Sequence, residues 1–152
     1  METSELFKLI QEKVHQQMTD SQENDCEPQL QKIKARLHTI ACLDENWDGY
    51  DATVPSEQTI RNSFKFVESA FKEGFTQLEP ADVYPTPYGS IVIEFKTEQT
   101  GLVSVEIGQE QIGFFTDFKN KPNYALDATQ SDFTEIHPTL KNVLNILKND
   151  KS

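Results

Sequence analysis

The sequence predicts an α+β fold with N-terminal helices, an antiparallel meander of three to four strands, and a C-terminal helix. Apolar side chains recur at helical spacing as far as about residue 74, which indicates amphipathic helices. After Pro80 the apolar period falls to two, which is typical of strands with one buried face. Helical spacing returns at Pro138. We therefore predict that residues 1–28 form a helix and an acidic linker, and that residues 29–150 form a single α+β domain.

Helices are expected in four places along the chain. The first spans residues 4–18, where one apolar stripe consists of Leu6, Phe7, Ile10, Val14 and Met18. Residues 19–28 are polar and acidic and end at a proline, which indicates a linker. The other helices are expected at residues 29–43, 55–74 and 138–147, each with its own apolar stripe.

The strands are expected in the second half of the chain. Residues 83–89 should form an extended segment and a turn that lead into the first strand. Three strands at residues 90–96, 102–107 and 112–118 are joined by short polar turns, which predicts a meander. Residues 124–128 are expected to add a short edge strand.

The pairing of these strands determines which side chains share a face. Ile93 is expected opposite Val105, and Phe95 opposite Val103, so that one face of the sheet is apolar and must be buried. The other face is expected to mix apolar and acidic side chains. Its members are Val92, Glu94, Leu102, Ser104, Glu106, Gly113 and Phe115.

This mixed face is the candidate partner-binding surface. Apolar and acidic side chains next to a glycine that admits close approach suit a protein contact surface. We expect Phe115, Val92 and Leu102 to supply the buried contact, while Glu94 and Glu106 steer a basic partner. The alternative is that the first or the last helix covers this face and makes its apolar residues a second small core.

The acidic charge limits the classes of partner. The chain has 14 basic and 25 acidic residues, for a formal net charge of −11. This charge disfavours direct binding to nucleic acid or to an anionic membrane, because both require a basic face. A basic protein partner, mimicry of nucleic acid and a homo-oligomer are all compatible with it, and so is an acidity that serves only to keep the protein dissolved.

A cytoplasmic location is expected from three features. The sequence has no run of about 18 apolar residues, which a membrane-spanning helix needs. Its first residues are acidic, whereas a secretory signal begins with basic residues. The two cysteines, Cys26 and Cys42, follow no paired framework, so we expect reduced thiols.

The segment after the second helix matches the opening of a calcium-binding loop. Asp44, Asn46 and Asp48 alternate and are followed by Gly49, which allows a sharp turn. The twelfth loop position, where calcium needs a bidentate acid, is Pro55. We therefore predict a structural turn that Asn and Asp side chains stabilise, without a metal. Calcium binding here is the minor alternative.

The turn itself consists of Trp47, Asp48, Gly49 and Tyr50. We expect Trp47 to be a structural anchor, because a buried indole ring usually also bonds its N–H to a backbone oxygen. A ligand-stacking role for this ring is the less favoured interpretation.

Three short motifs in a fixed order carry a resemblance to a known group of proteins. They are NWDGYDA at residues 46–52, PTPYGSI at residues 85–91 and VEI at residues 105–107. In this order they resemble small bacterial and phage proteins with a WDGY-type turn, a PTPxG-type turn and a following hairpin. The resemblance covers about residues 37–118, and departs from the commoner glycine before the tryptophan by having Asn46. That family is uncharacterised, so the resemblance implies no activity.

No catalytic constellation is visible in the sequence. The GxSxG, HExxH, Walker A and GxGxxG motifs are missing, and His15, His38 and His137 lack metal-ligand spacing. We therefore predict a non-enzymatic protein without catalytic residues, cofactor or metal: an acidic protein-binding module of the antitoxin, immunity or phage-inhibitor type. The alternatives are a nucleic-acid-mimicking inhibitor of a DNA- or RNA-binding protein, calcium binding through residues 44–48, and an enzyme of a class without sequence-visible motifs.

Overall fold

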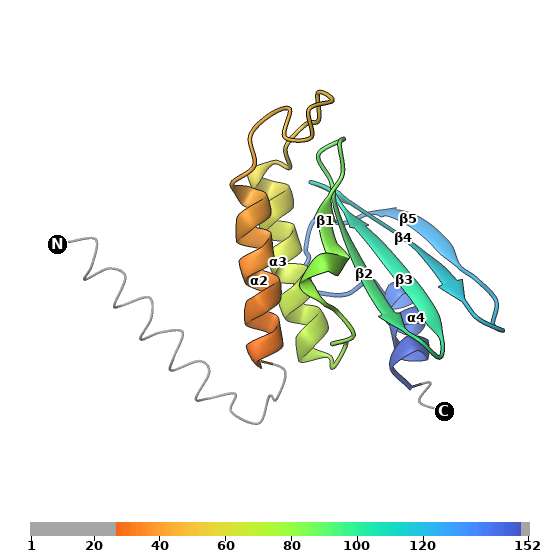
Figure 1. Ribbon diagram of the computed structural model, residues 1–152. Coiled ribbons are helices and arrows are strands. Elements are labelled where there is room, and N and C mark those ends of the chain that lie inside the picture. The colour runs from red at the N-terminus through yellow and green to blue at the C-terminus, as the bar shows by residue number, and fades with distance from the viewer. Residues whose placement is uncertain (1–26, 150–152) are drawn as a thin grey trace.

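The computed structural model describes residues 27–149. In this part of the chain three α-helices cover one face of a five-stranded antiparallel sheet (Figure 1). The α+β class is therefore confirmed, but the sheet has five strands and not the three to four that the sequence predicts. The helix predicted at residues 4–18 and most of the linker predicted at residues 19–28 lie outside the described residues.

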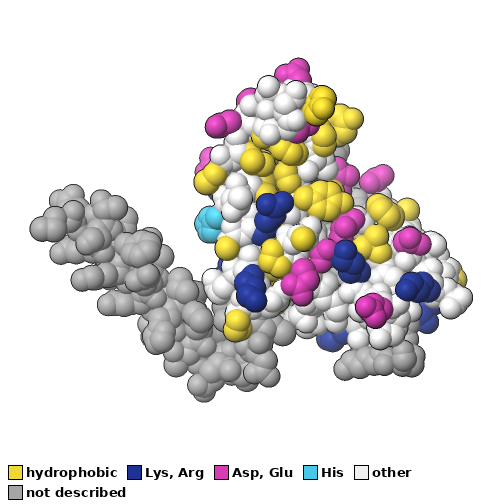
Figure 2. Space-filling view, viewed as in Figure 1, with side chains coloured by type: hydrophobic (Ala, Val, Ile, Leu, Met, Phe, Trp, Pro, Cys, Tyr) yellow, Lys and Arg dark blue, Asp and Glu magenta, His cyan; other side chains and the backbone are white. Residues whose placement is uncertain are grey.

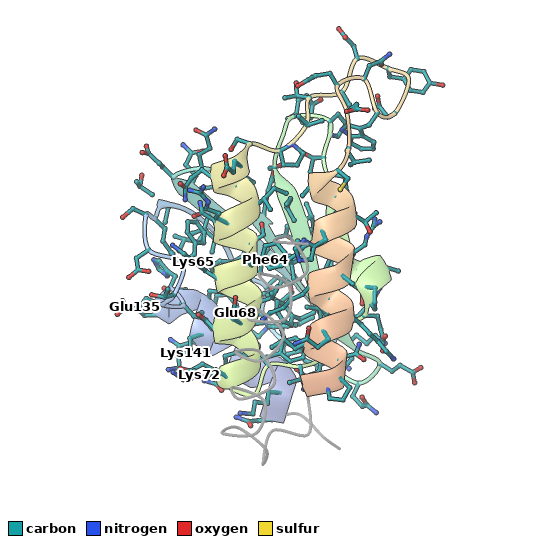
Figure 3. All side chains as sticks on the ribbon, turned by 90° about the vertical axis from the view of Figure 1, so that its left-hand side faces the viewer. Phe64, Lys65, Glu68, Lys72, Glu135 and Lys141 are labelled. Carbon is teal, nitrogen blue, oxygen red and sulfur yellow. The ribbon has the colours of Figure 1, made fainter. Side chains whose placement is uncertain are left out.

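Helices α2 (Glu27–Ala41) and α3 (Glu57–Lys72) lie side by side against the sheet (Figures 1 and 3). α3 begins after Ser56, whose side-chain oxygen accepts a hydrogen bond from the backbone N–H three residues later. This cap satisfies one of the donors that a helix start leaves free. Figure 3 shows the outward side of α3, which carries charged residues such as Lys65 and Glu68. Both helices are therefore amphipathic, as their spacing predicts.

The strands are joined in sequence order, and every neighbouring pair is antiparallel. They are β1 (Val83–Pro85), β2 (Ile91–Thr97), β3 (Gly101–Ile107), β4 (Gln111–Phe118) and β5 (Ala125–Thr129). The predicted register of β2 and β3 is confirmed, with Ile93 opposite Val105. The unexpected strand is β1, because residues 83–85 pair with β2 and do more than lead into it. Its proline is compatible with an edge position.

One apolar cluster lies between the helices and the inner face of the sheet, which is the face of Ile93 and Val105. Helix α4 (Pro138–Asn149) joins this cluster through Leu140, Val143, Leu144 and Leu147. All three described helices therefore pack on the inner face. The alternative in which the last helix covers the opposite face, called the outer face below, is wrong.

Candidate protein-binding face

The outer face carries two adjacent rows of side chains that run across the sheet. The first row takes one residue from each strand: Tyr84, Val92, Glu106, Gly113 and Asp127. The second row consists of Glu94, Ser104, Phe115 and Ala125. Five of the six residues that the sequence assigns to partner binding therefore lie together. The sixth, Leu102, lies in the next row between Lys96 and Asp117.

The predicted contact residues differ in how accessible they are. Phe115 is 50% exposed, whereas Val92 is 9% and Ser104 only 5% exposed. Both short side chains lie between longer neighbours, so they form the floor of the surface and offer little area to a partner. Leu102 is half-buried. Phe115 is thus the most accessible apolar residue of the predicted set, and Val92 offers much less exposed surface to a binding partner.

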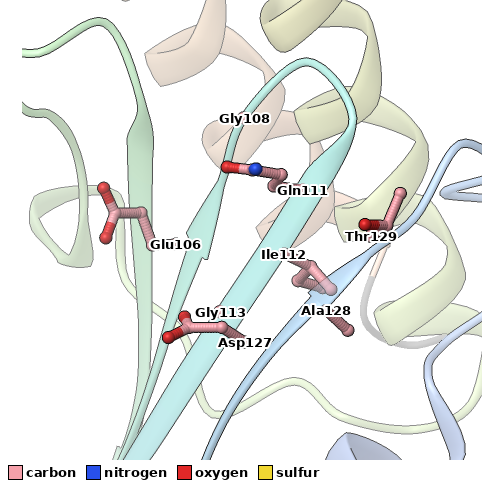
Figure 4. Close-up of a pocket in the computed structure, with 8 residues that line it drawn as sticks. All are labelled: Glu106, Gly108, Gln111, Ile112, Gly113, Asp127, Ala128 and Thr129. Carbon is pink, nitrogen blue, oxygen red and sulfur yellow. The ribbon is translucent and has the colours of Figure 1, made fainter.

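Two hollows with shared walls lie over these rows. One has a volume of about 320 Å³ and is lined by five of the six predicted residues, all but Leu102. The other has a volume of about 510 Å³ and extends from Glu106 across Gly113 to Asp127 and Thr129 at the edge strand (Figure 4). Since Glu106, Gly113 and Asp127 line both, the hollows form one depression that extends across the sheet from β1 to β5.

Gly113 determines how the edge strand contributes to this depression. A β-carbon at this position would lie 2.5 Å from the Asp127 Oδ1 atom. The missing side chain therefore lets the Asp127 carboxylate lie over the backbone of β4. Glu106 is opposite Gly113 on the other side, so two carboxylates flank one glycine (Figure 4).

Two acids of the outer face accept hydrogen bonds from hydroxyl groups. Glu94 accepts a hydrogen bond from the Tyr84 hydroxyl at 3.0 Å, and Glu106 accepts one from the Ser90 hydroxyl. None of the ion pairs among residues 27–149 includes Glu94, Glu106 or Asp127. Lys96, on the same face, pairs with the buried Asp82 at 2.9 Å, and that carboxylate, with a smaller contribution from Glu94, raises the pKa of Lys96. The surface is therefore anionic and open to a cation.

The charge around Tyr84 also affects its ionisation. Burial raises the pKa of the Tyr84 phenol, and the hydrogen bond to Glu94 raises it further, as do nearby carboxylates. The phenol thus remains a protonated donor that holds the Glu94 carboxylate in place.

Two members of this surface were missed from the sequence. Tyr84 was missed because residues 83–85 were expected to be only an extended lead-in, so no face could be assigned to it. Asp127 lies in the predicted edge strand, but its neighbours depend on the β4–β5 register. The sequence signal that could have placed Asp127 on the outer face is its position between Leu126 and Ala128, because these two residues are half-buried on the inner face.

The predicted structural turn forms a loop that stands above the ends of α2 and α3 (Figure 1). The Trp47 indole N–H donates to the Thr53 carbonyl at 3.2 Å, and the Thr53 N–H donates to the Pro87 carbonyl at 2.9 Å. Asp48 Oδ1 accepts from the backbone N–H of Tyr50 at 2.8 Å. Figure 2 shows acidic and hydrophobic side chains together at this end of the molecule.

The described part of the chain also bears on metal-ligating clusters and on membrane-spanning helices. Within residues 27–149, no group of three or more His, Cys, Asp and Glu side chains could hold a metal ion. The calcium-like motif has instead committed side-chain oxygens of Asn46 and Asp48 to backbone donors of its own loop. Among the same residues, no helix is both long and apolar enough to cross a membrane.

Comparison with known proteins adds no relative. No protein-family profile, curated protein or solved structure matches this chain. The resemblance to small bacterial and phage proteins with a WDGY-type turn therefore stays a prediction.

Proposed function

We propose that this chain is a non-enzymatic module that binds a basic protein through the outer face of its sheet. One observation supports this function above all. Glu94, Glu106 and Asp127 share a face with the half-exposed Phe115, and within residues 27–149 no helix covers that face and no basic side chain pairs with these acids.

The surface has the two components of a protein contact. Phe115 offers a rigid aromatic side chain whose burial stabilises a complex, as aromatic anchors do at interface centres. Glu94 and Glu106 are held by hydroxyl donors, so little conformational freedom is lost when a cation binds. The net charge of −11 attracts a basic partner over a distance before contact. An antitoxin, an immunity protein or a phage inhibitor that captures a basic protein would use such a surface.

Affinity capture from native bacterial lysate tests the proposal. The full-length protein, its Glu94→Lys/Glu106→Lys variant and a matched Glu45→Lys/Glu98→Lys variant are immobilised and compared. The control changes the net charge by the same amount, because both variants replace two glutamates with lysines. Its glutamates are exposed and lie outside the two hollows. We expect the native chain and the control to retain one basic protein that the outer-face variant loses.

Salt and folding controls complete the experiment. Retention should weaken as the ionic strength rises, because exposed charges are screened. Circular dichroism and urea unfolding check that both variants remain folded, because Glu94 is half-buried and hydrogen-bonded to Tyr84. A partner retained equally by both variants, or no partner at all, would overturn the proposal.

A further inference from the structure

The backbone of β5 presents unpaired hydrogen-bonding groups at the edge of the sheet. The Gln130 N–H donates to the Glu110 carbonyl at 2.9 Å, just beyond the paired part of β4 and β5. Hydrogen-bonded positions alternate along antiparallel strands. The backbone N–H and C=O groups of the even-numbered residues of β5 therefore point toward β4. The N–H and C=O groups of Ala125, Asp127 and Thr129 therefore point away from the sheet. These three residues are exposed, and no other described segment bonds to their backbone.

This edge lacks the usual protection against strand pairing. Exposed edges are commonly blunted by lysine, proline, a bulge or a covering segment. Residues Ala125–Thr129 contain no proline and no basic residue, and Asp127 is their one charge. The edge is also a wall of the 510 Å³ hollow, so an added strand would continue the proposed binding face.

We propose that the β5 edge binds an extended basic segment of the partner, which pairs antiparallel with β5 as a sixth strand. This inference rests on the proposed function and specifies how the partner is recognised. Backbone hydrogen bonds to Ala125, Asp127 and Thr129 give affinity, and alternate side chains of the segment give specificity.

The register assigns chemistry to both sides of the added strand. A residue opposite Asp127 joins the row of Asp127, Gly113 and Glu106. Strands are about 4.8 Å apart, so this residue lies directly beside Asp127, and a lysine or arginine side chain there can pair with the Asp127 carboxylate and point toward Gly113. The alternating residues point to the other side, where Leu126 and Ala128 are only half-buried and accept apolar side chains.

Charge argues against a second copy of this chain as the occupant. Two β5 strands paired antiparallel with complete overlap would place Asp127 opposite its own counterpart. Like charges directly opposite across strands are destabilising, and the net charge of −11 adds a general repulsion. A basic strand removes both penalties.

Binding of short model peptides to the full-length protein tests the edge. The probe is a capped peptide of alternating lysine and valine, and one control carries N-methyl groups on the lysines while another carries them on the valines. In antiparallel pairing opposite Asp127, the backbone groups of the lysines face β5, so lysine methylation removes those bonds and valine methylation does not. We expect lysine methylation to weaken binding about tenfold or more, and valine methylation to leave it nearly unchanged.

Exchanging the charges of the protein and the peptide provides a second, independent test of edge binding. The Asp127→Lys variant should lose the lysine–valine peptide and gain a glutamate–valine peptide, whereas Glu98→Lys, in the turn between β2 and β3, should do neither. Amide signals of Ala125, Asp127 and Thr129 should become protected from exchange only when the unmethylated or valine-methylated peptide is bound.

The outcomes separate this inference from the proposed function. If both methylated peptides bind like the parent and Asp127→Lys has no effect, edge pairing is overturned, even where Glu94→Lys/Glu106→Lys still abolishes partner capture. If the protein pairs through β5 with its own copy in sedimentation experiments, the basic occupant is overturned. A partner retained by the Glu94→Lys/Glu106→Lys variant overturns the proposed function instead.

Discussion

The two edges of the sheet are treated in opposite ways. At the β1 edge, Arg36 of α2 donates to the Val83 carbonyl at 2.9 Å, and Pro85 has no N–H to offer. The bond between the Thr86 N–H and the Ser90 carbonyl shows that the backbone groups of odd-numbered β1 residues point away from β2. The Arg36 bond and the missing N–H of Pro85 therefore both act on the free edge of β1. At the β5 edge, no described side chain or segment has this role.

The difference teaches that an exposed edge is not an unavoidable property of this sheet. A helix, an arginine and a proline close one edge, so a covered edge is compatible with the fold. The anionic depression reaches both edges, through Tyr84 at β1 and Asp127 at β5, but no described segment bonds to the edge backbone of β5. Unpaired backbone groups and a carboxylate therefore coincide at the β5 edge, which suits a binding site for a basic strand.

The largest expected effect comes from loosening the core packing of α2, the helix whose Arg36 closes the β1 edge. Leu37 is fully buried on the inner side of α2, and Leu37→Ala should lower the free energy of unfolding by about 2–5 kcal/mol. The matched change at the other edge, Leu126→Ala, should cost less than half as much, because Leu126 is only half-buried. Urea unfolding of both variants measures the difference, and equal losses would contradict the asymmetry.

A smaller effect should follow from removing only the arginine bond. Arg36→Ala leaves the Val83 carbonyl without its partner and should cost about 1 kcal/mol in urea unfolding. Arg36→Lys keeps the charge but not the fixed donor geometry and should recover only part of the loss. A stability unchanged in both variants would show that water replaces the bond without penalty.

Some of this asymmetry follows from the sequence and some does not. The β2–β3 register is predictable because apolar and polar residues alternate on both sides of a short turn, with Glu94 between Ile93 and Phe95 and Ser104 between Val103 and Val105. The closed edge is not predictable, because β1 is a strand of three residues with a proline. Its assignment depends on pairing with β2 and on Arg36, which lies 47 residues earlier in the chain.

The candidate site shows the same division. Alternation places Glu94, Glu106 and Phe115 on one face, but it cannot say that Val92 and Ser104 are covered by their neighbours. That depends on side-chain size in three strands at once. In the calcium-like segment the residue types fit a metal loop, yet the same oxygens also satisfy backbone donors, and the sequence alone does not decide between the two uses.

A third effect concerns association more than stability. Asp127→Val removes the one charge on β5 and should change the free energy of unfolding by no more than about 0.5 kcal/mol. The uncharged edge should nevertheless self-associate, which sedimentation velocity detects as a concentration-dependent dimer. The control is Asp117→Val, which removes a charge from the same face in β4 without altering the edge. Dimers formed equally by both variants would mean that loss of charge, and not the open edge, drives association.

The smallest expected effect concerns Tyr84, which lies at the β1 end of the outer-face row that extends to Asp127 at the β5 edge. Tyr84 on β1 has a raised pKa, so the folded state holds its proton more tightly than the unfolded state. The stability this provides is complete below the unfolded pKa of 10.0 and is lost as the pH rises through the higher pKa of the folded state. Tyr84→Phe should therefore flatten the fall in stability above pH 10.0, measured by urea unfolding at neutral and alkaline pH. A fall as steep as in the native protein would show that the ionisation of Tyr84, whose pKa is raised by burial first and by the bond to Glu94 second, contributes nothing to it.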